Sequence, residues 1–230
     1  MATTNTMNPS SCTEPLSCRL AGLYAITDAS HTDPETLARA VELALRGGAR
    51  LIQYRDKTRQ PARRARCAKM LRALTHRHRA LLIINDDCRL ADAVQADGVH
   101  LGRDDACIAE ARALLGPAAI IGVSCYNRYQ LARQAAAAGA DYVAFGRFHP
   151  SRTKPDAVQA DRELLRRAKR ELNIPLVAIG GITAANARPL IDAGADMLAV
   201  VGDLFSQPDI EAAARQYQPL FNDDTRDTAR

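Results

Sequence analysis

Three polar side chains at alternating positions give this sequence its clearest chemical signal. Gln53, Arg55 and Lys57 follow the apolar residues Leu51 and Ile52. Successive side chains of an extended chain point to opposite faces, so these three share one face. An amide with two cations suits a diphosphate, because Arg holds two oxygens at once and Lys adds a point charge. The alternative is an ordinary charged loop whose side chains lie in water.

Carboxylates at two later places are candidate metal ligands. Asn85, Asp86 and Asp87 follow one apolar run, and Asp105 lies just after the next. Carboxylates beside a diphosphate are the ligands that Mg²⁺ (magnesium) prefers, so we expect Asp86 and Asp105 to bind it, with Asn85 as a hydrogen-bond partner. The alternative is that these residues cap the helices that follow, since Asn and Asp are preferred there.

One serine and two glycine-containing segments are candidates for binding phosphate. Ser124 ends an apolar run, as do Gly180-Gly181 and Val201-Gly202. Glycine lets backbone N–H groups approach phosphate oxygens, especially beside a helix N-terminus. Tight packing between strand and helix is the alternative reason for these glycines. Cys125 has no histidine within its motif to activate it, so we expect a packed thiol there rather than a nucleophile.

The segment 146–155 combines hydroxyls, a lysine and a histidine between two prolines. Ser151, Thr153 and Lys154 are typical of phosphate and diphosphate contacts. His149 is a candidate general base, although a lone histidine is more often structural. The alternative is a solvated turn.

Eight short apolar runs alternate with helical patterns along most of the chain. The runs are apolar nearly throughout, as expected of parallel strands buried on both faces. The clearest helix start is Asp33-Pro34, with a capping residue and a proline in the first turn. This order predicts an α/β fold, and the number of runs predicts a single-domain (β/α)8 TIM barrel. The expected strands are 22–26, 51–54, 81–84, 98–101, 120–123, 142–145, 176–179 and 197–201, and the expected helices are 34–45, 62–78, 89–96, 106–115, 128–138, 162–172, 184–193 and 208–216.

A barrel would bring these candidate residues together, because barrel active sites lie at the carboxyl ends of the strands. The opposite ends carry a repeated phrase in which Gly48, Gly139 and Gly194 are each followed by Ala. Glycine just after a helix takes the left-handed conformation that ends it. We therefore expect these junctions to serve stability.

Composition limits the other possibilities. The 230 residues carry a net charge of +5, much of it from an Arg-rich stretch over 55–79 that we interpret as a solvated helix face. No nucleic-acid-binding pattern and no apolar run of membrane-spanning length occurs. Six scattered cysteines without a secretory signal predict reduced thiols and a cytoplasmic location. We expect a disordered leader over 1–18, the barrel over 19–218 and a flexible tail over 219–230. The sequence does not decide between a monomer and a homo-oligomer.

Taken in order, the motifs resemble those of the thiamine phosphate synthase family. The resemblance runs from about Leu23 to Phe205, and the order and spacing of the motifs carry it. They are Gln53 to Lys57, Asn85-Asp86 with 96–102 and Asp105, Gly122 to Ser124, Ser151 to Lys154 and Ala178 to Ile182.

The resemblance implies a transferase of thiamine biosynthesis that forms thiamine phosphate. It would join 4-amino-2-methyl-5-hydroxymethylpyrimidine diphosphate to 4-methyl-5-(2-phosphoethyl)thiazole, or its carboxylated form, with Mg²⁺ assisting the loss of diphosphate. The pyrimidine diphosphate would be held by Gln53, Arg55, Lys57, Asn85, Ser124 and Lys154, and of these Arg55, Lys57 and Lys154 would be catalytic. Mg²⁺ would be bound by Asp86 and Asp105. The thiazole phosphate would be held by Ser151, Thr153, Gly181, Val201 and Gly202.

This chain departs from the family pattern at three single positions and in the segment Arg147 to His149, where the family more often has a proline-containing loop. The family usually has Gln at Arg103, Thr at Ser151 and Ser at Gly202. Two other readings stay open: a thiazole tautomerase of the same superfamily, and a non-catalytic barrel that binds thiazole phosphate. The diphosphate cluster and the two carboxylates favour the synthase.

Overall fold

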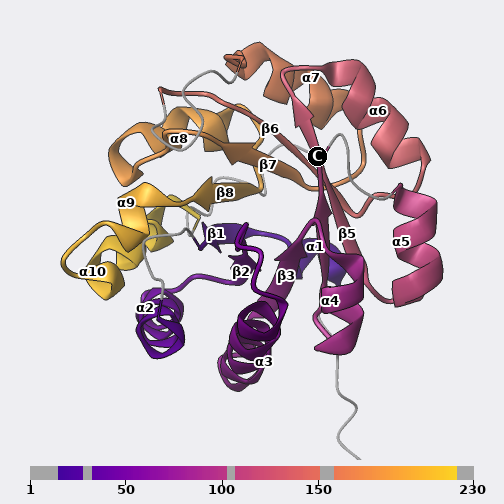
Figure 1. The fold of residues 1–230 in the computed structure, drawn as a ribbon. Coiled ribbons are helices and arrows are strands. Elements are labelled where there is room, and N and C mark those ends of the chain that lie inside the picture. The colour runs from indigo at the N-terminus through magenta and orange to yellow at the C-terminus, as the bar shows by residue number, and fades with distance from the viewer. Residues whose placement is uncertain (1–14, 28–32, 103–106, 151–157, 222–230) are drawn as a thin grey trace, which may run out of the picture.

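Eight parallel strands close into a barrel with helices around it (Figure 1). The computed structural model describes residues 15–27, 33–102, 107–150 and 158–221. The strands follow one another in chain order, and β8 pairs with β1 to close the sheet. The predicted single-domain (β/α)8 TIM barrel is therefore confirmed. The strands are β1 Gly22–Ile26, β2 Leu51–Tyr54, β3 Leu81–Asn85, β4 Gly98–Leu101, β5 Ile120–Tyr126, β6 Tyr142–Gly146, β7 Leu176–Ile179 and β8 Met197–Val200.

A helix follows every strand, as the sequence pattern predicts. Asp33 caps α2 through the backbone N–H of Thr36 at 2.9 Å, which confirms that start. The helices are α2 Pro34–Arg46, α3 Pro61–Arg77, α4 Cys88–Ala93, α5 Ile108–Leu115, α6 Tyr129–Ala137, α7 Arg162–Glu171, α8 Ala184–Asp192 and α10 Ile210–Arg215. None of the described helices is long and apolar enough to cross a membrane.

Three short elements were not predicted: α1 Leu16–Arg19, α9 Gly202–Phe205 and the 3₁₀ turn η1 Gln218–Leu220. The boundary predicted at residue 18 falls inside α1, and the one at residue 219 falls inside η1. Most of the predicted leader and tail lies outside the described residues. None of the described cysteines forms a disulfide.

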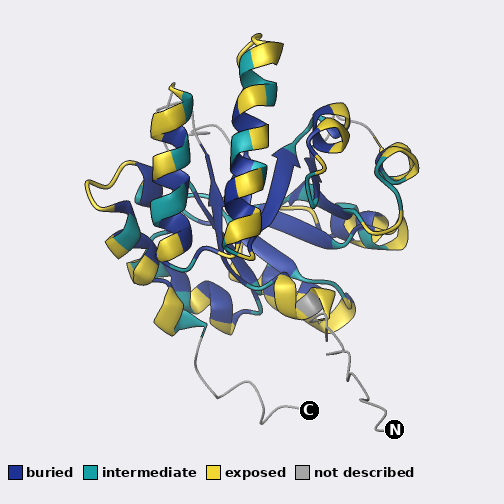
Figure 2. Cartoon of the chain, turned by 90° about the horizontal axis from the view of Figure 1, so that it is seen from below, coloured by how far each residue is buried: buried dark blue, intermediate teal, exposed yellow. Residues whose placement is uncertain are grey.

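The alternation of side chains divides the core into two regions, and Figure 2 shows the buried strands enclosed by helices that expose their outer faces. Ala25, Ile52 and Val143 belong to the outer region between strands and helices. Leu51, Ile83 and Met197 belong to the barrel interior, and Leu20, just after α1, is fully buried with them. Two tyrosines also lie in this interior, at positions 24 and 142.

Two features recur at the amino ends of the strands. Gly48, Gly139 and Gly194 have φ angles of 101°, 90° and 108°, the left-handed conformation that the repeated phrase predicts. Directly before β4, β6 and β8, an aspartate accepts a hydrogen bond from a backbone N–H of the preceding strand and binds a cationic side chain of the helix before that strand. The trios of aspartate, N–H and cation are Asp97, Leu82 and Arg72; Asp141, Ile121 and Arg112; and Asp196, Leu176 and Lys169.

Replacing Asp141 by Ala tests whether these aspartates stabilise the fold. The carboxylate accepts the N–H of Ile121 and the guanidinium of Arg112, each at 2.8 Å. Its loss leaves the strand N–H and the cation without this acceptor, so we expect the free energy of unfolding to fall by about 1–3 kcal/mol in urea titrations. Asp92→Ala, at an exposed carboxylate of α4, is the control and should change little. Equal stability of the two variants would contradict a structural role for Asp141.

Candidate active site

The predicted site residues that the structure describes lie at the carboxyl ends of strands. Because the strands are parallel and the barrel is closed, these ends surround one mouth. Gln53 lies in β2, Asn85 ends β3 and Ser124 lies in β5, while Asp86, Gly181 and Val201 follow β3, β7 and β8. The other predicted residues, Asp105, Ser151, Thr153 and Lys154, lie outside the described residues, as does Arg103.

A continuous chain of hydrogen bonds links two of these candidates across the barrel. Gln53 Nε2 donates to the hydroxyl of Tyr24 at 2.8 Å, and that hydroxyl lies 2.8 Å from the hydroxyl of Tyr142. The Tyr142 hydroxyl lies 3.0 Å from His100 Nδ1, and His100 Nε2 lies 2.8 Å from Ser124 Oγ. The chain thus joins β2, β1, β6, β4 and β5 through side chains alone.

This chain is buried. Gln53 is 3% exposed, Tyr24 1%, Tyr142 0% and His100 8%. Burial raises the pKa of both phenols above the ordinary value, and for Tyr142 well above it, because the phenolate cannot be hydrated there. Both tyrosines therefore keep their protons, and each supplies one O–H donor.

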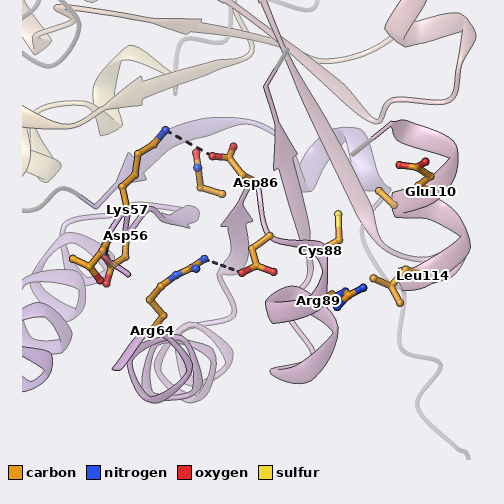
Figure 3. Close-up of a pocket in the computed structure, with 12 residues that line it drawn as sticks. Asp56, Lys57, Arg64, Asp86, Cys88, Arg89, Glu110 and Leu114 are labelled. Carbon is orange, nitrogen blue, oxygen red and sulfur yellow. Dashed lines mark hydrogen bonds and ion pairs between the residues drawn. The ribbon is translucent and has the colours of Figure 1, made fainter. Parts of the chain in front are cut away.

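Charged groups of opposite sign meet after β2 and β3. Lys57 Nζ lies 3.9 Å from Asp86 Oδ2, and Figure 3 shows the two side chains pointing toward each other. Asp86 has a φ of 65°, a left-handed conformation that Asp tolerates better than most residues. Its neighbour Asp87 is the helix cap, accepting the N–H of Leu90 at 2.9 Å. The capping alternative therefore applies to Asp87.

Arginines of α3 anchor the two loops that carry these charges. Arg63 binds Asp56. Arg64 binds Asp87 at 2.8 Å, and the dashed line from Arg64 in Figure 3 marks this pair. Burial acts to raise the pKa of Asp56, but hydrogen bonds from Thr58 and Tyr54 and the charge of Arg63 outweigh it and lower that pKa. The solvated face that we expected for this stretch is therefore wrong at these positions, since Arg63 and Arg64 are mostly buried against carboxylates.

A cavity of about 660 Å³ opens beside these loops, between the ends of β2 and β3 and the helices α4 and α5. Its lining includes Lys57, Asn85, Asp86, Arg89 and Glu110. The part of the chain that the structure describes holds no group of three or more metal-binding side chains, and of the two predicted ligands only Asp86 is described.

The glycines after β7 have a packing role. Gly181 has a φ of 61°, and a Cβ there would lie 2.2 Å from the carbonyl oxygen of Pro150. The segment after β6 can therefore pack closely only because this residue is glycine, and the binding of phosphate by Gly181 stays a prediction. Gly202 is different, because a Cβ there would meet only Ser206 Oγ, at 3.9 Å. The usual serine of the family would fit at this position.

Sequence reasoning missed Tyr24, His100 and Tyr142 as parts of the site. The sequence did carry one signal for them: side chains alternate between the two faces of a strand, and each of these three occupies a position that faces the barrel interior. The expectation for Cys125 is confirmed: it is 0% exposed, and burial raises its pKa to about 12, so no thiolate is available at neutral pH.

The sequence profile described as "Thiamine monophosphate synthase" matches residues 23–204 of the chain. The chain belongs to the thiamine monophosphate synthase family. Two members of this family, both named "Thiamine-phosphate synthase", are close relatives. The one from Thiobacillus denitrificans is 58% identical over 200 residues, covering 87% of this chain and 94% of the relative. The one from Thioalkalivibrio sulfidiphilus is 56% identical over 203 residues, covering 88% and 96%.

A solved structure agrees with this assignment to the family. The "Thiamine phosphate pyrophosphorylase" from Pyrococcus furiosus superimposes with a TM-score of 0.81 at 35% sequence identity, covering 90% of this chain and 98% of that chain. The family resemblance stated from the motifs is thereby confirmed.

Substitution of the two neighbouring aspartates separates their roles. Asp87→Ala removes the cap of α4 and the partner of Arg64, so we expect the free energy of unfolding to fall by about 1–2 kcal/mol. Asp86→Asn should cost much less, because Asn also tolerates the left-handed conformation. Urea titrations of both variants provide the measurement, and a greater loss in Asp86→Asn would reverse the assignment of the cap.

Proposed function

We propose that this chain is a thiamine phosphate synthase, which joins hydroxymethylpyrimidine diphosphate to thiazole phosphate and releases diphosphate. The observation that carries the proposal is the family match over residues 23–204, within which polar side chains converge at one barrel mouth. We place the activity in the cytoplasm, in keeping with described cysteines that form no disulfide. Its partners are small-molecule substrates.

In this proposal the pyrimidine diphosphate occupies the mouth above β2, β3 and β5. Gln53 orients the pyrimidine, while Arg55, Lys57 and Lys154 neutralise the diphosphate, and Asn85 and Ser124 add hydrogen bonds. The position of Lys57 beside Asp86 supports this assignment, because the cation lies near the end of β3, where Asn85 also lies. The thiazole phosphate is assigned to Ser151, Thr153, Gly181, Val201 and Gly202.

Asp86 and Asp105 are the proposed ligands of Mg²⁺. A carboxylate that is not used as a helix cap and lies beside a cationic diphosphate site fits a hard divalent ion. When bound, Mg²⁺ supplies positive charge that stabilises diphosphate as a leaving group.

The reaction needs no nucleophile from the protein. The C–O bond of the pyrimidine breaks and its electron pair leaves with the diphosphate, and the lone pair of the thiazole nitrogen then forms the new C–N bond. Arg55, Lys57 and Lys154 stabilise the charge that develops on the departing oxygens, which is the kind of preorganised electrostatic effect that dominates many enzymes. The buried, protonated Cys125 agrees with this scheme.

Release of diphosphate tests the function directly. With both substrates and Mg²⁺ present, we expect diphosphate and thiamine phosphate in equal amounts. A tautomerase or a non-catalytic thiazole-phosphate-binding barrel would release no diphosphate, and that result would overturn the proposal.

Removing one cation tests the site. Lys57→Ala should lower the rate about a hundredfold, the scale of losing one preorganised charge contact, and Lys154→Ala should do the same. Lys69→Ala, on the exposed side of α3, is the matched control and should keep the wild-type rate. Steady-state kinetics of diphosphate release provide the comparison; wild-type turnover by Lys57→Ala would remove that residue from the mechanism.

A further inference from the structure

The buried hydrogen-bond chain has a direction that its own members impose. Gln53 donates an N–H to the hydroxyl oxygen of Tyr24, so the single proton of Tyr24 is left for another acceptor. Within the described residues, the only other hydrogen-bond partner of that hydroxyl is Tyr142. Tyr24 therefore donates to Tyr142.

The next hydrogen bond, between Tyr142 and His100, has a direction as well. Tyr142 accepts from Tyr24, and the remaining described partner of its hydroxyl is His100 Nδ1 at 3.0 Å. Donation by Tyr142 requires a lone pair on Nδ1, so the imidazole carries its proton on Nε2. That N–H faces Ser124 Oγ at 2.8 Å and donates to it, which leaves the hydroxyl proton of Ser124 free to turn toward the mouth.

The barrel is shaped to hold this arrangement. A Cβ at Gly122 would lie 1.9 Å from Tyr142 Cζ and 2.3 Å from its hydroxyl oxygen, so the phenol occupies space that only glycine leaves open. The ring of Tyr142 stacks on His100 with 5.7 Å between centroids and meets Tyr24 edge-on at 6.0 Å. These contacts hold each donor and acceptor in one orientation.

We propose that Tyr24, Tyr142 and His100 are positioning residues that form a polarised hydrogen-bond relay, holding His100 as the neutral Nε2–H tautomer and Ser124 as a donor to the substrate diphosphate. The role of Ser124 toward diphosphate rests on the proposed function. With the opposite polarity Ser124 would give its proton to His100 and would meet an anion with lone pairs. The direction of the relay therefore decides whether Ser124 attracts or repels the diphosphate.

The tautomer of His100 provides a test that needs no substrate. In the full-length protein labelled with ¹⁵N, long-range ¹H–¹⁵N correlation spectra distinguish protonated from unprotonated ring nitrogens, and His100→Gln identifies the His100 signals by their loss. We expect an unprotonated Nδ1 and a protonated Nε2. An Nδ1–H tautomer would overturn the proposal.

Breaking the relay should allow His100 to adopt both neutral tautomers. Tyr142→Phe keeps the ring and removes only the hydroxyl, so the His100 signals should shift toward a mixture of tautomers. Tyr24→Phe breaks an earlier link and should have the same effect, which keeps the test available if the first variant does not fold. Tyr217→Phe deletes a different fully buried hydroxyl, bonded to Asp203, and should leave the His100 signals unchanged. An unaltered Nε2–H tautomer in both relay variants would also contradict the proposal.

Kinetics then connect the relay to the substrate. In Tyr142→Phe we expect kcat/KM for the pyrimidine diphosphate to fall on the order of tenfold to a hundredfold, the scale of one hydrogen bond to a charged group. The KM for the thiazole phosphate should stay within about twofold, because Tyr142 is not among the residues assigned to that substrate. If the KM for the thiazole phosphate rose as much as the KM for the pyrimidine diphosphate, the variant would have general structural damage, and the positioning role would be overturned. If the chain released no diphosphate at all, the function would fail while the tautomer result stood on its own.

Discussion

Side chains alternate between two faces of every strand, and in a closed barrel one of those faces has no solvent beside it. A polar side chain at an inward position can therefore be accommodated in two ways. Near the carboxyl end it reaches the open mouth, where Asp86 and Lys57 meet. Deeper in the barrel it must find a partner on another strand, because an unpaired buried polar group is costly. Tyr24, Tyr142 and His100 satisfy one another in this way.

The buried relay connects these two zones. Its ends, Gln53 and Ser124, belong to the proposed substrate site, while its middle lies among the apolar residues of the interior. A fully satisfied network in a region of low dielectric is rigid, since breaking any one bond leaves a group without a partner. The network thus fixes the positions of Gln53 and Ser124 in the barrel, and the ion pairs of α3 fix the charged loops after β2 and β3.

The fold was largely predictable, because each apolar run ends at a turn residue and is followed by a helical pattern. The bounds of β1, β2, β4 and β7 match their predicted ranges, whereas β5 runs on to Tyr126 through an irregular register that no local pattern indicates. Asp86 and Asp87 could not be told apart from sequence, since either suits a helix cap and only the backbone decides.

The relay could not be predicted from local sequence patterns, for a different reason. Tyr24 and Tyr142 are 118 positions apart in the chain, and their contact depends on barrel closure and on the space above Gly122. The family motifs drew attention to Gln53 and Ser124, and the segment 96–102 contains His100, but nothing in them indicated that Tyr24 and Tyr142 complete the connection.

The proposed reaction requires a diphosphate bound at this one mouth, and a crystal structure with the pyrimidine diphosphate and Mg²⁺ tests that most directly. It should show the diphosphate in contact with Lys57 and the hydroxyl of Ser124, with the metal on Asp86. A diphosphate bound elsewhere on the molecule, with Lys57 and Ser124 left untouched, would contradict the account.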